Sequence, residues 1–202
     1  TLLTMTPSTI LSRADLDFLL HDWLRVSELC ERERYSDHSR ETIDAVMDLS
    51  AELAEKYFAP HNRKADLNEP RLVGEEVELI PEIGEALRRF ADADLVGAAM
   101  DAKVGGMQLP STASLACMAW FYAANISTAA YPLLSTGNAN LLLTHGTREQ
   151  IDRYVRPMIE GRFSGTMCLS EPQAGSNLAD ITTRAEPQPD GTYRLFGQKM
   201  WI

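Results

Sequence analysis

The sequence predicts an α+β protein in which a helical domain, residues 1–161, precedes the start of a β domain, residues 162–202. Three observations support this prediction. Apolar residues recur at helical spacing through most of the helical part. Beyond Gly161 the period changes, and β-branched residues appear in the alternating segments 181–185 and 193–196. Pro189-Asp190-Gly191, between these segments, is typical of a turn.

The first 60 residues predict two helices that precede the main helical region. Ser12 can cap the first helix, with Asp15 three positions later and leucines recurring at helical spacing. The second is expected from about Ser39 to Tyr57, ended by Pro60. The polar stretch 62–78 predicts a loop.

Further helices are expected up to Gly161. Pro81 suits the first turn of a helix that Gly97 can close. The run 113–126 is apolar on nearly every face, which predicts a helix in the middle of a bundle, and 132–145 is also apolar. Thr147-Arg148-Glu149-Gln150 is a capping box that opens the last helix. Residues 165–169 are expected to be extended, and a β domain of so few strands would bury little.

Composition excludes several classes of function. Hydrophobic residues make up 45% and charged residues 24% of the 202 positions, as in ordinary globular proteins. The net charge of -10, from 19 basic and 29 acidic residues, argues against binding to nucleic acid or anionic membranes. No apolar run approaches the roughly 20 residues of a membrane span. Residues 1–6 show no secretory signal pattern, and with no Met at position 1 the true start is left open.

Cysteines and histidines give no sign of a metal site. The three cysteines include no CxxC pair, and we expect Cys30 and Cys117 to be small buried side chains in a cytoplasmic, reducing compartment. The four histidines are scattered without the spacing of metal ligands.

The segment 166–177 contains the most informative chemistry. From the residues alone it is a strand that runs into a turn containing Pro172 and Gly175, with hydroxyls and backbone N–H groups that could bind an anion or a polar heterocycle. An ordinary transition from strand to loop explains the same residues, and both interpretations stay open at this point.

This segment, Met-Cys-Leu-Ser-Glu-Pro-Gln-Ala-Gly-Ser-Asn at 167–177, closely resembles the acyl-CoA dehydrogenase pattern Cys-x-Thr-Glu-Pro-x-Ala-Gly-Ser-Asp. Residues 197–202, Gly-Gln-Lys-Met-Trp-Ile, resemble the second flavin motif of that family, at about the family's separation. Residues 101–106 and 141–161 also resemble the family, and 1–60 resemble the extra helices of its larger bacterial branch, which includes the 3-methylmercaptopropionyl-CoA dehydrogenases. The resemblance implies a β-barrel domain after the helices and a carboxyl-terminal helical domain that is absent from this chain.

The resemblance also implies FAD as cofactor. Met167, Leu169 and Ser170 would lie along the isoalloxazine, with the Ser170 hydroxyl donating to the ring. Trp201, beside Ile202 in the second motif, would pack against the flavin and exclude water. The alternative for Trp201 is an aromatic side chain of the β-domain core.

For the substrate, the resemblance implies that Ser176 contacts the CoA portion. The alternative is that its hydroxyl only stabilises the turn. Ala129, Ala130, Leu133 and Gly137 would line the acyl-chain tunnel, where small side chains leave room for a long or bulky chain. Ordinary close packing between helices explains these four residues equally well.

No catalytic residue is expected in this chain. Glu171 is not assigned as the base, because in relatives this position is structural and the base comes from the carboxyl-terminal helical domain. We therefore expect the chain alone to bind FAD poorly and to lack dehydrogenase activity. The chain departs from the family pattern at Ser170, which replaces Thr, at Met167, which replaces a frequent aromatic residue, and at Asn177, which replaces Asp.

The activity that the resemblance implies is α,β-desaturation of an acyl-CoA thioester, with electrons passed to an electron-transferring flavoprotein. The resemblance also implies that the protein is a homodimer or tetramer. Two alternatives remain: an oxidase or flavin monooxygenase of the same fold, and a non-catalytic helical module that only binds a partner.

Overall fold

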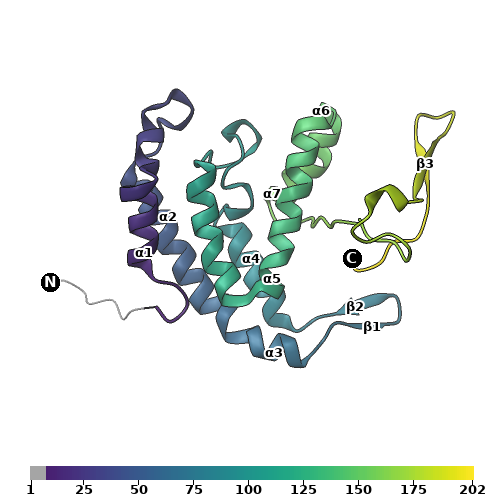
Figure 1. Cartoon of the computed structure of the whole chain (residues 1–202), viewed down its shortest axis with the longest axis horizontal. Coiled ribbons are helices and arrows are strands. Elements are labelled where there is room, and N and C mark those ends of the chain that lie inside the picture. Colours follow the sequence, from purple (N-terminus) through teal and green to yellow (C-terminus); the bar gives the residue numbers. More distant parts are fainter. Residues whose placement is uncertain (1–7) are drawn as a thin grey trace. The chain divides into compact units, whose positions relative to one another are not determined.

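The structure, a computed structural model, describes residues 8–202, which divide into a helical unit ending at Gly165 and a small unit, Thr166–Ile202 (Figure 1). The helices are α1 Arg13–Asp17, α2 Arg40–Leu53, α3 Asn62–Leu67, α4 Pro81–Asp92, α5 Ser111–His145, α6 Arg148–Gln150 and α7 Arg156–Ile159. The strands are β1 Arg71–Val73, β2 Glu76–Glu78, β3 Arg184–Pro187 and β4 Tyr193–Phe196, and they form two separate antiparallel hairpins, β1–β2 and β3–β4.

Several helical turns outside the α-helices complete the described elements. They are π-helical at Phe18–Trp23, Ala54–Phe58 and Ile151–Val155, and 3₁₀ at Val26–Glu31, Glu33–Tyr35, Ala59–His61, Leu95–Gly97, Ala102–Val104 and Leu178–Asp180. None of the described helices combines the length and hydrophobicity that crossing a bilayer requires.

The break in α5 organises the helical unit. Asn125 has extended backbone angles, φ -164° and ψ 90°, inside the helix. Its side-chain Oδ1 accepts the N–H of Thr128 at 3.1 Å, which caps the second half of α5, and its Nδ2 donates to the carbonyl of Phe58 at 3.2 Å. The Thr128 hydroxyl lies 2.8 Å from Nε2 of His61. A buried polar network therefore ties the broken helix to the turns that follow α2.

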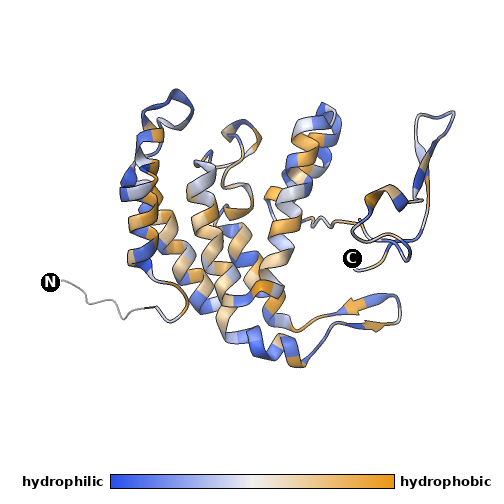
Figure 2. Cartoon of the chain, viewed as in Figure 1, coloured by the Kyte–Doolittle hydropathy of each residue, from blue (hydrophilic) through white to orange (hydrophobic). Residues whose placement is uncertain are grey.

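Aromatic side chains fill the core beside this break. Phe121 of α5 packs edge-on against Phe58 and Phe90, with ring centroids 4.8 Å apart in both pairs, and Trp120 is fully buried next to it. Figure 2 shows hydrophobic residues along the helices that meet at α5. The run 113–126 therefore packs centrally, as predicted, although Leu115 is 65% exposed.

The amino-terminal segment covers a second apolar cluster. Ser12 caps α1 as predicted, because its hydroxyl accepts the N–H of Asp15 at 3.2 Å. The Arg13 guanidinium forms ion pairs with two carboxylates of α2, that of Asp44 at 3.2 Å and that of Asp48. The buried members of the cluster are Leu20, Val26, Ile43, Met47, Ala113, Ala116 and Cys117.

The predictions around Pro60 and Gly97 were wrong. The chain stays helical past Pro60, because proline fits an early position of the new turn Ala59–His61, and α3 follows directly. The expected loop 62–78 contains this helix and the hairpin β1–β2, whose turn uses Gly74 at φ +66°. The helix α4 begins at Pro81 as predicted, but it ends at Asp92, before Asp94 adopts φ +57°, so Gly97 does not close it.

The end of the chain follows the sequence more closely. The capping box at Thr147 forms as predicted, with Gln150 N–H 3.2 Å from the Thr147 hydroxyl. The turn at 189–191 joins β3 and β4, with Gly191 at φ +84°. Residues 165–169 pair with neither hairpin, and β3 begins at Arg184 rather than at Ile181 because the N–H groups of 182 and 183 bind a side chain instead.

We expect Asn125→Ala to lower the free energy of unfolding by about 2 kcal/mol, because it removes the cap of the second half of α5 and leaves the Phe58 carbonyl without its donor. The measurement is urea denaturation followed by circular dichroism. Asn140→Ala, at an exposed position of the same helix, is the matched control and should change stability little. Equal losses in the two variants would contradict the role of Asn125.

Thiol reactivity should separate Cys117 from Cys168. Burial raises the pKa of the Cys117 thiol to about 11, whereas Cys168 is exposed. At pH 8 only about 0.1% of Cys117 would be thiolate, the reactive form. We therefore expect iodoacetamide to label Cys168 quickly and Cys117 only after unfolding, as followed by mass spectrometry. Similar rates at both thiols in the folded protein would refute this.

Candidate functional site

The residues predicted to contact flavin lie in the small unit and leave apolar surface uncovered. Met167 is 61%, Leu169 43%, Trp201 86% and Ile202 62% exposed, while Ser170 is half-buried. The two motifs meet directly, because the N–H of Met200 donates to the carbonyl of Ser170 at 3.0 Å. The predicted groups are therefore gathered on two segments that lie side by side.

Glu171 is the buried centre of this unit, with only 4% of its surface exposed. Its Oε1 accepts Lys199 Nζ at 2.8 Å and the Thr183 N–H at 3.0 Å. Its Oε2 accepts the Thr182 N–H and hydroxyl, both at 2.9 Å, and Gln173 Nε2 at 2.6 Å. A carboxylate with five donors suits a structural anion and not a proton acceptor.

The same contacts decide how Glu171 titrates. The Lys199 ammonium, helped by donors at 182 and 183, holds the pKa of Glu171 far below its ordinary value of 4.5. Because the folded pKa is lowered, the arrangement contributes stability above about pH 4.5 and loses it as the pH falls further. At neutral pH the carboxylate is ionised and fully engaged.

Gly197, the first residue of the second motif, lies close against Thr183. Its φ is +156°, and a Cβ at this position would lie 2.8 Å from the Thr183 Cβ and 2.9 Å from its Cα. Only glycine permits this close approach of the two chains. The glycine of the second motif therefore lets the chain pass close to Thr183.

The residues of this unit fit a flavin. The segment 166–170 belongs to neither hairpin, and its Leu169 and Ser170 carbonyls accept Lys199 Nζ at 3.1 Å and the Met200 N–H at 3.0 Å. Exposed Met167, Leu169 and Trp201 offer apolar and aromatic contact, and Ser170 adds a hydroxyl. A flavin ring needs both kinds of contact, apolar over its faces and polar at its pyrimidine edge.

The predicted acyl-chain residues separate onto two faces of α5. Ala129 is fully buried in the aromatic core. Leu133 is 47% exposed, and Gly137 is also exposed with no atom within 4 Å of a Cβ built there. Ala130 is half-buried between them. The structure therefore leaves Leu133 and Gly137 open to contact, while Ala129 serves the packing of the helices; Ser176 is exposed in the small unit.

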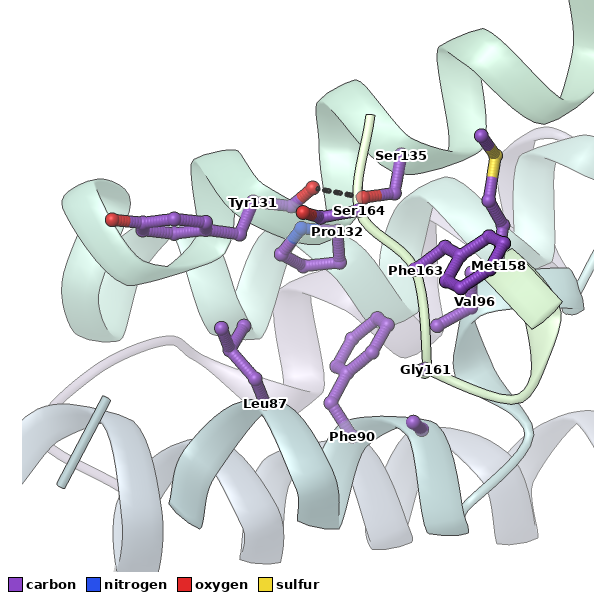
Figure 3. Close-up of a pocket in the computed structure, with 11 residues that line it drawn as sticks. Leu87, Phe90, Val96, Tyr131, Pro132, Ser135, Met158, Gly161, Phe163 and Ser164 are labelled. Carbon is purple, nitrogen blue, oxygen red and sulfur yellow. Dashed lines mark hydrogen bonds between the residues drawn. The ribbon is translucent and has the colours of Figure 1, made fainter. Parts of the chain in front are cut away.

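Two cavities in the helical unit were not predicted from the sequence. One, of about 60 Å³, lies between α4, α5, α7 and the segment after α7 (Figure 3). Ser135 lines it, accepts the Gly165 N–H at 3.1 Å and donates to the Tyr131 carbonyl at 2.8 Å. The other, of about 160 Å³, lies beside His61. Neither approaches the roughly 300–1,000 Å³ of a typical ligand pocket.

The fold also gathers Asp17, His21 and Asp44, whose ligand atoms lie within 4.8 Å of one another. The sequence analysis missed this group, although Asp17 and His21 stand four residues apart on one helical turn. Arg13 already binds both carboxylates, and His21 Nε2 lies 2.9 Å from Asp44. The group therefore forms an ion-pair network around Arg13.

Comparison with known proteins agrees with this geometry. The family model described as acyl-CoA dehydrogenase, N-terminal domain, matches residues 40–162. A 3-methylmercaptopropionyl-CoA dehydrogenase of Ruegeria pomeroyi is 32% identical over 183 residues, which cover 91% of this chain and 31% of the relative. The caffeyl-CoA reductase-Etf complex subunit CarC of Acetobacterium woodii is 31% identical over 158 residues, covering 72% of this chain and 41% of the relative.

Solved structures share the fold. The acyl-CoA dehydrogenase complexed with FAD from Bacillus anthracis superposes with a TM-score of 0.67 at 22% identity, covering 82% of this chain and 27% of that one. Since the family model spans more than half of the sequence, the chain belongs to the acyl-CoA dehydrogenase family. It spans about a third of the length of the Ruegeria relative.

We expect Gly197→Ala to displace the second motif from Thr183, because the added methyl group collides with that residue and the backbone angle disfavours any side chain. Hydrogen exchange at residues 182–200 should become at least about tenfold faster, corresponding to a loss near 1.4 kcal/mol. Gly175→Ala is the control, because a Cβ there meets no atom within 4 Å. Unchanged exchange in Gly197→Ala would disprove the need for glycine.

Proposed function

We propose that the whole protein is an FAD-dependent dehydrogenase that introduces an α,β double bond into an acyl-CoA thioester. The observation that supports this most strongly is the meeting of the two motifs in the small unit, where the Met200 N–H binds the Ser170 carbonyl at 3.0 Å. Membership of the acyl-CoA dehydrogenase family supports the same reaction.

In this proposal each predicted residue has a definite task. A bound flavin would supply the acceptor for the hydride that desaturation removes from the β carbon. The Ser170 hydroxyl donates to the ring, Met167 and Leu169 contact its face, and Trp201, beside Ile202, keeps water away.

Other residues bind the substrate. Ser176 contacts the CoA portion. Leu133 and Gly137, with Ala130 at their edge, accept the acyl chain, because they lie on the exposed face of α5. Buried Ala129 supports that helix from within. Glu171 takes no proton in this proposal, because its carboxylate already accepts five donors.

The proposal extends to the partners of the whole protein. An electron-transferring flavoprotein would reoxidise the flavin, a partner for which the Etf complex subunit of Acetobacterium woodii is the supporting relative. A cytoplasmic homodimer or tetramer is the expected state.

The decisive experiment is an absorbance spectrum of the full-length protein, with and without an acyl-CoA, in the absence of oxygen. We expect flavin bands that bleach when the acyl-CoA is added, because hydride transfer reduces the ring. The 2-enoyl-CoA of equal chain length is a control for binding without hydride transfer, because its α,β bond is already double. Bands that stay unchanged across a panel of acyl-CoAs would favour an oxidase or monooxygenase, and no flavin uptake at all would favour a non-catalytic module.

A further inference from the structure

Glu171 and Lys199 connect the two motifs through side chains that do not belong to the predicted flavin surface. The Lys199 ammonium lies 2.8 Å from Glu171 Oε1 and 3.1 Å from the Leu169 carbonyl. Lys199 thereby spans both the carboxylate and the main chain of the first motif. The side chains are 1% exposed for Glu171 and 20% for Lys199, so water competes little for this ion pair.

The pair stands next to the residues that matter for the cofactor. Ser170 directly precedes Glu171, and Trp201 lies two positions beyond Lys199. A main-chain bond from the Met200 N–H to the Ser170 carbonyl, 3.0 Å long, joins the same two segments beside this pair. Joining segments some 28 residues apart costs chain entropy, which charge-assisted hydrogen bonds can offset.

We propose that Glu171 and Lys199 are a positioning pair that holds the two flavin motifs together before the cofactor arrives, and so raises flavin affinity without touching the flavin. This inference rests on the proposed function. Preorganisation of this kind increases affinity because the ordering cost is met during folding instead of during binding. The pair also orients the bound ring, because Ser170 is next to Glu171 in the chain and Trp201 lies two residues after Lys199.

The full geometry favours positioning over catalysis. The Glu171 carboxylate is already bound by Lys199, Thr182, Thr183 and Gln173, so no lone pair remains directed at a substrate. Lys199 is likewise occupied by Glu171 and the Leu169 carbonyl. Both groups act on the flavin only through the chain segments that they join.

The test uses the full-length protein, stripped of flavin and titrated with FAD, with Lys199→Met and Glu171→Gln as the principal variants. We expect each to weaken FAD binding at least about tenfold, the usual effect of losing a charge-assisted hydrogen bond. The double variant should be little weaker than either single one, because both remove the same interaction. Lys199→Arg, which retains the charge, should recover most of the affinity.

Glu186→Gln is the matched control. It makes the same chemical change and breaks the exposed ion pair with Arg184 in the same unit, 2.8 Å long. It should leave FAD affinity within about twofold of the wild type, as expected for a surface ion pair.

A second measurement separates positioning from a general loss of stability. The visible circular dichroism of bound flavin reports its orientation, so Lys199→Met should alter this signal at saturating FAD, while Glu186→Gln should not. Wild-type affinity with an unchanged signal in Lys199→Met would overturn the proposal. So would a lowered melting temperature with unaltered circular dichroism of the bound flavin.

The experiment also distinguishes this inference from the function on which it rests. If the wild-type protein takes up no FAD, the proposed function fails. If the wild type binds FAD and is bleached by acyl-CoA while the variants bind FAD equally well, only the positioning pair is refuted. Should Glu171→Gln not fold, as judged by its far-ultraviolet spectrum, the more exposed Lys199 variants decide the question.

Discussion

The helical unit depends on one buried amide, that of Asn125. A continuous helix over Ser111–His145 would point its second half along the axis of the first, and the aromatic cluster around Phe121 occupies the bend between them. The break leaves free N–H groups, which are costly inside a core unless they find partners. The side-chain oxygen of Asn125 accepts one of these N–H groups, that of Thr128, and its nitrogen donates to the Phe58 carbonyl. One side chain therefore caps the second half of α5 and holds the break against the turns after α2.

Local signals were predictable from the sequence, and long-range ones were not. Ser12 and Thr147 were recognised as caps because capping depends on residues within one turn. The hairpin β1–β2 was missed because its strands are only three residues long and their side chains are all exposed, so no alternation of buried and exposed positions marks them. The break at Asn125 lies in a continuous apolar run, and its cause, a contact with Phe58 far back in the sequence, leaves no periodic pattern.

The candidate site shows the same division. Met167, Ser170 and Trp201 were predicted as flavin contacts because the two motifs stand in order at the family's spacing, and that information is sequential. Burial was harder to foresee: Ala129 and Leu133 stand four residues apart, yet the first is in the core and the second is open. The role of Glu171 was anticipated only as structural. Three of its five donors come from Thr182 and Thr183, which lie outside both motifs, and only the folded chain shows that Gln173 and Lys199 bind the same carboxylate.

The segment before residue 40 has a consequence for the evolution of this fold. The family model matches from residue 40 onward, and Leu20 and Val26 ahead of it share a buried cluster with Ile43 and Met47 of α2. A relative without such a segment would present those two positions to water, where large apolar side chains favour aggregation or capture by another chain. Losing the segment therefore exposes apolar surface on α2. We expect such a loss to be accompanied by polar replacements on α2, or by a new neighbour that makes the same contact.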